Sequence, residues 1–296
     1  MSRDIIGPGT AVGEVISDPA FGDFGRLLFP IGRGVRPEMA LKGISTPRTF
    51  VWYTDVRAEE TVEIIAELKR RAEAGKRIFI PLYPEEEISR DPSAADTGLF
   101  FFSGKPGAPF AVTCPGGGFA YVAALHDGLP HALALSKLGY NAFTLIYRTE
   151  CPYDDLARAL WVIESNAEKL GVAEDGYSLW GGSAGARMAA ALGNSDVLAS
   201  YGLRIPQASA AVMQYTGYSR VSRHDAPAYA CVGTEDWIAD WRVMRDRSEA
   251  LKKAGVDSEV HVYAGLGHGF GMGVGTKAEG WFREAVSFWE RHMPAD

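Results

Sequence analysis

Short apolar stretches alternate with longer amphipathic ones from residue 98 to the end of the sequence. The apolar stretches have the length of strands and cover residues 97–102, 109–114, 141–147, 176–180, 208–215, 227–233 and 259–265. The amphipathic stretches have helical spacing and cover residues 129–139, 154–171, 185–193, 241–255 and 279–293. This alternation predicts an α/β fold, with a mostly parallel central sheet and helices on both faces. Right-handed crossovers would carry the carboxyl end of every strand to one edge of the sheet, where such folds bind ligands.

Residues 1–95 follow a different pattern. The stretch "RAEETVEIIAELKRRAEAGK" (57–76) predicts an amphipathic helix with acids early and bases late, and "DPAFGDFGRLLFP" (18–30) also has helix-like spacing. A short strand, "RIFIPLY" (77–83), is expected to follow. We therefore expect residues 1–95 to form an α-rich extension that packs on a catalytic domain of residues 96–296. The sequence leaves open whether the extension caps a pocket, covers a sheet edge or forms a dimer interface.

Charge and composition limit the classes of partner. The formal net charge is -7 and no dense Lys/Arg run occurs, which argues against nucleic acid or an anionic membrane surface as the main partner. Cys114, Cys151 and Cys231 are too scattered for a disulfide framework or a zinc site. No apolar run has the length of a signal peptide or a membrane span, so a cytoplasmic location is the default expectation, although a chain trimmed of its leader would look the same. A homo-oligomer remains open.

The stretch "LWGGSAGAR" (179–187) places Ser183 between two glycines, directly after a predicted strand and before a predicted helix. This is the context of a G-x-S-x-G nucleophile elbow, a sharp turn that exposes a reactive serine. The helix amino terminus also favours the negative charge that develops during acyl transfer. The pattern predicts that Ser183 is a nucleophile, and the alternative is an ordinary turn serine.

A nucleophilic serine needs a base and an acid, which in this architecture follow it in the order Ser, acid, His. His268 lies in a glycine-rich loop after the strand at 259–265 and is the predicted base. Asp236 lies in the acidic turn after the strand at 227–233 and is the predicted acid, with Asp240 and Glu235 as the alternatives.

The stretch "TCPGGGFAY" (113–121) also follows a predicted strand. Successive glycines expose backbone N–H groups, so this loop predicts an oxyanion hole formed by Gly117 and Gly118 together with the N–H of Ala184. A flexible turn is the alternative.

Together these residues resemble the α/β-hydrolase superfamily. The stretch "CPGGGFAYVAALHDGLPHALALSKLGYNAFTLIYR" looks like the oxyanion-loop region of its bacterial esterase and acetyl-xylan-esterase-like members. The resemblance covers about residues 98–292. It implies an α/β-hydrolase fold and a serine hydrolase of carboxylic esters, with Ser183, Asp236 and His268 at the triad positions.

Several other residues flank the predicted catalytic loops. His126 and Asp127 are expected either to line the mouth of a pocket or to cap a helix. Arg148 is expected to contact an anionic substrate group or to form a structural ion pair. Four aromatic residues are candidates for an apolar substrate pocket, with a role in the core as the alternative: Phe119, Tyr121, Tyr215 and Trp237.

The predicted function is hydrolysis of small or short-chain acyl esters, acetylated carbohydrates among them, through an acyl-enzyme. The substrate would be a small-molecule ester, and neither a metal nor an organic cofactor is expected. The alternatives are a peptidase, thioesterase or lactonase with the same triad, and a catalytically silent binding protein of this fold.

Overall fold

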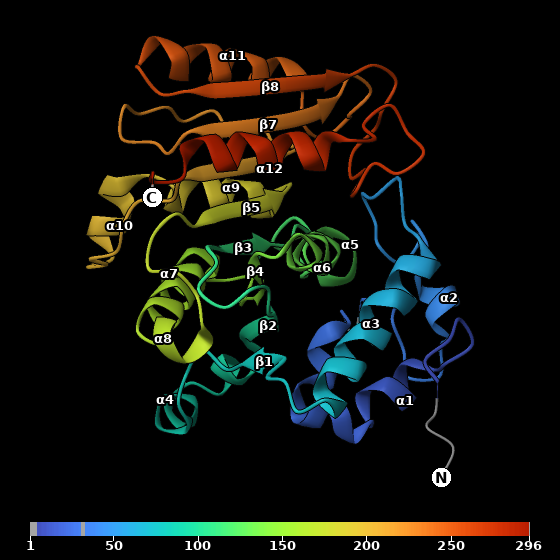
Figure 1. Ribbon diagram of the computed structural model, residues 1–296. Coiled ribbons are helices and arrows are strands. Elements are labelled where there is room, and N and C mark those ends of the chain that lie inside the picture. The colour runs from blue at the N-terminus through green and yellow to red at the C-terminus, as the bar shows by residue number, and fades with distance from the viewer. Residues whose placement is uncertain (1–4, 31–32, 296) are drawn as a thin grey trace.

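The computed structural model describes residues 5–30 and 33–295. Eight strands form one sheet in the order β1-β2-β4-β3-β5-β6-β7-β8, which runs from the bottom to the top of Figure 1. The strands are β1 (Phe79–Ile80), β2 (Gly98–Phe102), β3 (Phe110–Cys114), β4 (Asn141–Ile146), β5 (Ser178–Gly182), β6 (Ala210–Gln214), β7 (Ala228–Gly233) and β8 (Ser258–Tyr263). The mostly parallel sheet predicted from the sequence is confirmed.

One strand runs against the others. β2 is antiparallel to both of its neighbours, β1 and β4, whereas all pairs from β4 to β8 are parallel. The expectation that every strand ends at the same edge is therefore wrong for β2. The short turn between β2 and β3 does not make a hairpin, because β4 lies between these two strands.

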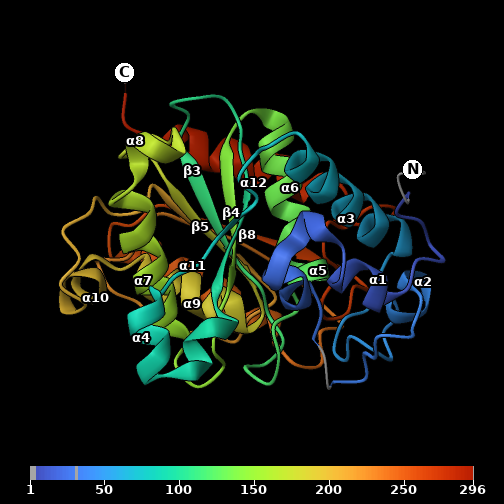
Figure 2. The ribbon, with the colours of Figure 1, turned by 90° about the horizontal axis from the view of Figure 1, so that it is seen from below.

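Helices cover both faces of the sheet (Figure 2). α6 (Leu129–Leu138) and α12 (Trp281–His292) lie on one face, and α7 (Pro152–Glu164) and α9 (Ala184–Leu192) on the other. α11 (Trp241–Lys253) packs on β7 and β8. The remaining helices of this region are short: α5 (Ala124–Asp127), α8 (Ala167–Leu170) and α10 (Ser195–Ser200). The single helix predicted over 154–171 is divided into α7 and α8.

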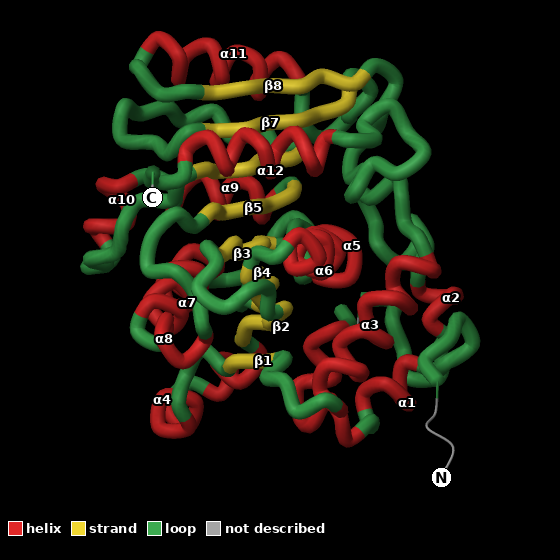
Figure 3. Tube along the Cα trace, viewed as in Figure 1, coloured by secondary structure: helices red, strands yellow, loops and turns green. Residues whose placement is uncertain are grey.

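The N-terminal segment is mostly helix and loop, as Figure 3 shows by colour. Its elements before β1 are α1 (Val12–Ile16), a 3₁₀ helix (Pro19–Leu28), α2 (Leu41–Ile44) and α3 (Ala58–Glu73). After β1 come α4 (Glu85–Arg90) and a second 3₁₀ helix (Pro92–Asp96). The long helix predicted at 57–76 is confirmed as α3. The stretch at 18–30 forms a 3₁₀ helix with non-helical dihedral angles at Gly22, and the predicted strand at 77–83 is reduced to two residues.

Apolar side chains join the N-terminal segment to the sheet region. Ile64, Ile65 and Leu68 of α3 belong to the same buried cluster as Leu125 of α5 and Leu133 of α6. The division of the chain at residue 95 stays a prediction. None of the helices in the described ranges is both long and apolar enough to span a membrane.

Candidate active site

The turn that carries Ser183 connects β5 to α9 in a single residue. β5 ends at Gly182 and α9 begins at Ala184, and Ser183 has φ 53° and ψ −115°, a conformation that side-chain-bearing residues rarely adopt. A Cβ atom at Gly181 would lie 2.3 Å from the carbonyl carbon of Gly185, and one at Gly185 would lie 1.8 Å from the carbonyl oxygen of Cys114. The two glycines are therefore required because β5, α9 and the loop that follows β3 approach one another too closely for a side chain.

Ser183, His268 and Asp236 lie in one chain of hydrogen bonds. The distance from Ser183 Oγ to His268 Nε2 is 3.0 Å, and that from His268 Nδ1 to Asp236 Oδ2 is 2.8 Å. The other oxygen of Asp236 accepts bonds from the backbone N–H groups of Ile238 (2.8 Å) and Ala239 (2.7 Å). Asp236 and His268 are almost entirely buried, whereas Ser183 is partly exposed. Such an arrangement orients the imidazole and leaves the hydroxyl open to a small molecule.

The two alternative acids lie elsewhere. Asp240 is exposed and accepts a bond from the backbone N–H of Arg242 as the N-cap of α11 (2.9 Å). Glu235 is exposed at the surface. Of the three acids in this turn, Asp236 is the one in contact with His268.

The glycine loop after β3 carries the predicted oxyanion donors, and we call it the oxyanion loop; it lies against the turn that carries Ser183. Gly117 and Gly118 both have positive φ, 114° and 63°, which glycine tolerates. Within the described parts of the chain, the N–H groups of Gly117, Gly118 and Ala184 have no hydrogen-bond acceptor. The neighbouring Gly116 N–H is different, because it donates to Asp127 Oδ2 (2.8 Å). Free donors of this kind can bind an oxyanion.

Asp127 forms a second buried cluster beside these residues. Its carboxylate is 1% exposed and accepts hydrogen bonds from Tyr53 (2.9 Å), Tyr215 (2.6 Å) and the N–H of Gly116. Burial without a paired cation raises the pKa of Asp127 to about 6, although the three donors favour the charged form. A Cβ at Gly182 would lie 2.2 Å from Oδ1, so the carboxylate also packs on the residue before Ser183.

His126 and Asp127 are both buried, which the sequence did not predict. His126 is 2% exposed, its ring centroid lies 4.0 Å from that of Phe50, and burial lowers its pKa to about 3. It therefore does not line a pocket mouth. Neither residue caps α6, whose N-cap is Gly128 and has no side-chain bond.

A stretch of the N-terminal segment crosses this site, and we call residues 50–57 the strap. In Figure 1 the blue loop beyond α2 rises to the orange-red loops that follow β7 and β8. The backbone N–H of Thr54 donates to the carbonyl of His268 (3.1 Å), and so does its hydroxyl (2.8 Å). The strap carries no sequence pattern that predicts this position, because the partner of Thr54 lies 214 residues away in the chain.

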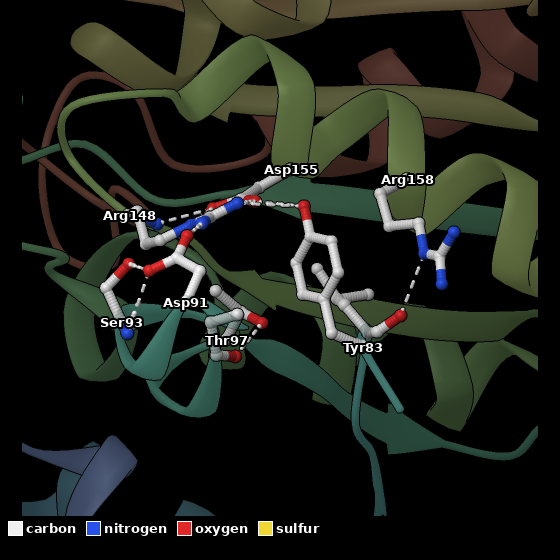
Figure 4. A network of polar contacts seen from close by, with 9 residues as sticks. Tyr83, Asp91, Ser93, Thr97, Arg148, Asp155 and Arg158 are labelled. Carbon is white, nitrogen blue, oxygen red and sulfur yellow. Dashed lines mark hydrogen bonds and ion pairs between the residues drawn. The ribbon is translucent and has the colours of Figure 1, made fainter. Parts of the chain in front are cut away.

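Arg148 lies in a network of ion pairs and hydrogen bonds with Asp91, Asp155 and Tyr83 (Figure 4). Its guanidinium contacts Asp155 (Nη2 to Oδ1, 2.6 Å) and Asp91 (Nη1 to Oδ2, 2.5 Å). The structural alternative for Arg148 is thus the one observed. Arg148 and Tyr121 also line a cavity of about 560 Å³ between the N-terminal segment and the end of β4.

The four aromatic candidates occupy different surroundings. Tyr215 is fully buried, with its ring centroid 4.9 Å from that of His268. Phe119 has φ 55° and packs near Tyr153, with 6.1 Å between ring centroids. Tyr121 is 7% exposed, whereas Trp237, which follows Asp236, is 71% exposed. Their participation in a substrate pocket stays a prediction.

The fold and part of the sequence resemble known hydrolases. The model of the dienelactone hydrolase family matches residues 154–281. The structure of an acetyl ester-xyloside bifunctional hydrolase from Caldicellulosiruptor lactoaceticus is 22% identical, with a TM-score of 0.63 over 72% of this chain and 95% of that one. A propionate-bound esterase from Thermogutta terrifontis is 21% identical, with a TM-score of 0.58 over 69% of this chain and 93% of that one. The α/β hydrolase MGS-M1 from a Medee basin deep-sea metagenome library is also 21% identical, with a TM-score of 0.56 over 66% and 92% of the two chains.

At this identity the structural likeness shows the fold, which is the predicted α/β-hydrolase fold. No curated protein sequence matches the chain. The names of the family and of the two ester-cleaving structures agree with the predicted class, a carboxylic ester hydrolase.

Proposed function

We propose that the protein hydrolyses small carboxylic esters through an acyl-enzyme on Ser183. The observation that carries the proposal is the chain of hydrogen bonds from Ser183 through His268 to Asp236, at 3.0 and 2.8 Å. It lies beside three backbone N–H groups that have no acceptor among the described residues.

In the first step His268 Nε2 takes the hydroxyl proton while Ser183 Oγ attacks the ester carbonyl carbon. The carbonyl oxygen becomes an oxyanion, which would accept bonds from the N–H groups of Gly117, Gly118 and Ala184. Asp236 holds the imidazole and stabilises its positive charge. The tetrahedral intermediate collapses, the bond to the alcohol oxygen breaks, and His268 gives its proton to that oxygen.

In the second step water attacks the acyl carbon and gives a proton to His268. The bond from the acyl carbon to Ser183 Oγ then breaks, and the proton returns to that oxygen. The products are a carboxylic acid and an alcohol, and the enzyme regains its starting state.

Lactones are a second candidate class of substrate. A lactone is a cyclic ester that the same steps open, and the match of residues 154–281 to the dienelactone hydrolase family favours it. Rates on p-nitrophenyl acetate, simple lactones, acetylated sugars and aminoacyl substrates separate these classes from a peptidase.

The decisive experiment is Ser183→Ala, with Ser200→Ala on the exposed side of α10 as the matched control. We expect Ser183→Ala to keep its thermal unfolding midpoint and to lose ester turnover by about 10⁴-fold or more, whereas the control keeps its turnover. A fluorophosphonate probe should label wild type and Ser200→Ala but not Ser183→Ala. Unchanged turnover in Ser183→Ala would contradict the proposal, and a wild type that neither turns over nor takes the probe would support a silent binding protein.

A further inference from the structure

Backbone strain is concentrated in one part of this molecule. Among the described residues, four that are not glycine have positive φ: Trp52 (80°), Phe119 (55°), Ser183 (53°) and Tyr215 (36°). Three of them belong to the site described above, as the residue after the oxyanion glycines, the proposed nucleophile and the ring that packs on His268. Such conformations cost free energy and persist mainly where a site requires them. The fourth, Trp52, lies in the strap and has no role in the steps proposed so far.

The indole of Trp52 lies against the oxyanion loop. A Cβ atom built on Gly118 would be 2.7 Å from Cζ3 and 3.0 Å from Cη2 of this ring. The ring also stacks on Tyr121, with 6.0 Å between centroids and 20° between planes. The edge of the indole therefore occupies the space that a side chain at Gly118, a proposed oxyanion donor, would need.

Contacts on both sides of Trp52 fix the strap. The hydroxyl of Tyr121 donates to the carbonyl of Val51 (2.9 Å), which ties the preceding residue to the oxyanion loop. Two residues further on, Thr54 is bonded to the carbonyl of His268. The strap is thus anchored on one side of Trp52 to the loop that would bind the oxyanion and on the other side to the loop that carries the proposed base.

Despite these contacts Trp52 stays 36% exposed, and Val51 beside it is 44% exposed. A large aromatic ring that is held rigidly and remains partly open can supply stacking area to a ligand at a low cost in side-chain entropy. A tryptophan that served only the hydrophobic core would be buried and would not require a backbone with positive φ.

We propose that Trp52 is a specificity-determining residue that stacks on a planar apolar ring of the substrate, next to the scissile ester. This inference rests on the proposed function. The favoured substrates are esters with an aromatic ring on the alcohol or on the acid, and the experiment below distinguishes the two.

The test compares three esters: ethyl acetate, phenyl acetate with the ring on the alcohol, and ethyl benzoate with the ring on the acid. The variants are Trp52→Gly, which suits a positive φ, and Trp52→Phe, which keeps a ring. Trp161→Ala is the matched control, because Trp161 is 48% exposed on α7. Thermal unfolding of each variant shows whether it is folded.

We expect Trp52→Gly to lower kcat/KM for one of the two ring-bearing esters by about three- to tenfold more than for ethyl acetate, mainly through KM. Trp52→Phe should recover most of that loss, and Trp161→Ala should leave all three values unchanged. Equal losses on all three esters in Trp52→Gly, or no loss on any, would overturn the inference while the wild type remains an esterase. A wild type that hydrolyses none of the esters and is not labelled at Ser183 by the fluorophosphonate would instead overturn the proposed function.

Discussion

Two buried aspartates join the N-terminal segment to the sheet region, and they do so in opposite ways. Asp127 accepts a hydrogen bond from Tyr53 of the strap (2.9 Å), and Asp155 accepts one from Tyr83 after β1 (2.6 Å). Asp127 is 1% exposed and Asp155 is 0% exposed. Each contact therefore pairs a tyrosine of the N-terminal segment with a carboxylate that water does not reach.

The difference lies in what balances the charge. Asp155 accepts from the backbone N–H, Nε and Nη2 of Arg148, so its charge is compensated by a cation (Figure 4). Asp127 accepts only from neutral donors, and burial raises its pKa to about 6. A compensated carboxylate is typical of a structural joint, whereas an uncompensated one costs stability and is common at functional sites. Asp127 lies next to the proposed catalytic residues, because it accepts a hydrogen bond from the Gly116 N–H and packs on Gly182 beside Ser183.

The largest expected effect is on stability at Asp155. Asp155→Ala leaves the largely buried side chain of Arg148 with Asp91 as its one acidic contact among the described residues, and it removes the acceptor of Tyr83. We expect the free energy of unfolding to fall by about 3–5 kcal/mol, as measured by urea denaturation. The kcat of the remaining folded enzyme should not change. A loss of kcat in folded Asp155→Ala would remove the contrast between the two aspartates.

Asp127 should show the reverse pattern. Asp127→Asn keeps the shape of the side chain and removes a buried charge, so we expect little change in the free energy of unfolding at pH 7. The amide cannot accept all three hydrogen bonds, so the oxyanion loop should shift and kcat should fall by about 100-fold with KM nearly unchanged. Steady-state kinetics on phenyl acetate measures this. A large loss of stability at unchanged kcat would make Asp127 a structural joint like Asp155.

Features that depend on local sequence pattern could be predicted, whereas contacts between distant residues could not. Strands β3 to β7 were predictable because buried parallel strands appear as apolar runs, whereas β8 is a less buried edge strand in which polar and apolar residues alternate. Ser183, Asp236 and His268 could be selected because each follows one of these strands. These choices depend on local pattern together with one rule about the sheet edge.

The strap could not be found in this way. Tyr53 meets Asp127 across 74 residues, and nothing near position 53 marks it as a partner of a buried acid. The antiparallel direction of β2 could not be predicted either, since an apolar run carries no information about strand direction. Asp127 drew attention because it follows the predicted oxyanion loop near the start of a helix, but its contacts are tertiary and have no local signature.

The third prediction concerns pH. Asp127 has a pKa of about 6 in the folded protein, above the usual 3.8, so between these values the folded state binds more protons than the unfolded state. Stability from this group is therefore fully present below about pH 4 and is lost as the pH rises through about 6. We expect the free energy of unfolding of wild type, relative to Asp127→Asn, to fall by about 2 kcal/mol between pH 4 and pH 7. Denaturation curves of both proteins at each pH measure the difference, in which the other titrating groups cancel. A difference that does not vary with pH would show that Asp127 is an ordinary ionised carboxylate.

The smallest effects separate the two tyrosines. Tyr53→Phe and Tyr83→Phe each remove one hydroxyl that donates to a buried aspartate, and we expect each to lower the free energy of unfolding by about 1 kcal/mol. Only Tyr53→Phe should also reduce kcat, because Tyr53 precedes Thr54, which is bonded to the His268 loop, and contacts the carboxylate that holds Gly116. Tyr83 contacts a joint that does not reach Ser183, so its variant serves as the control. If both variants lower kcat equally, the two joints act as one unit and the distinction drawn from their charges is wrong.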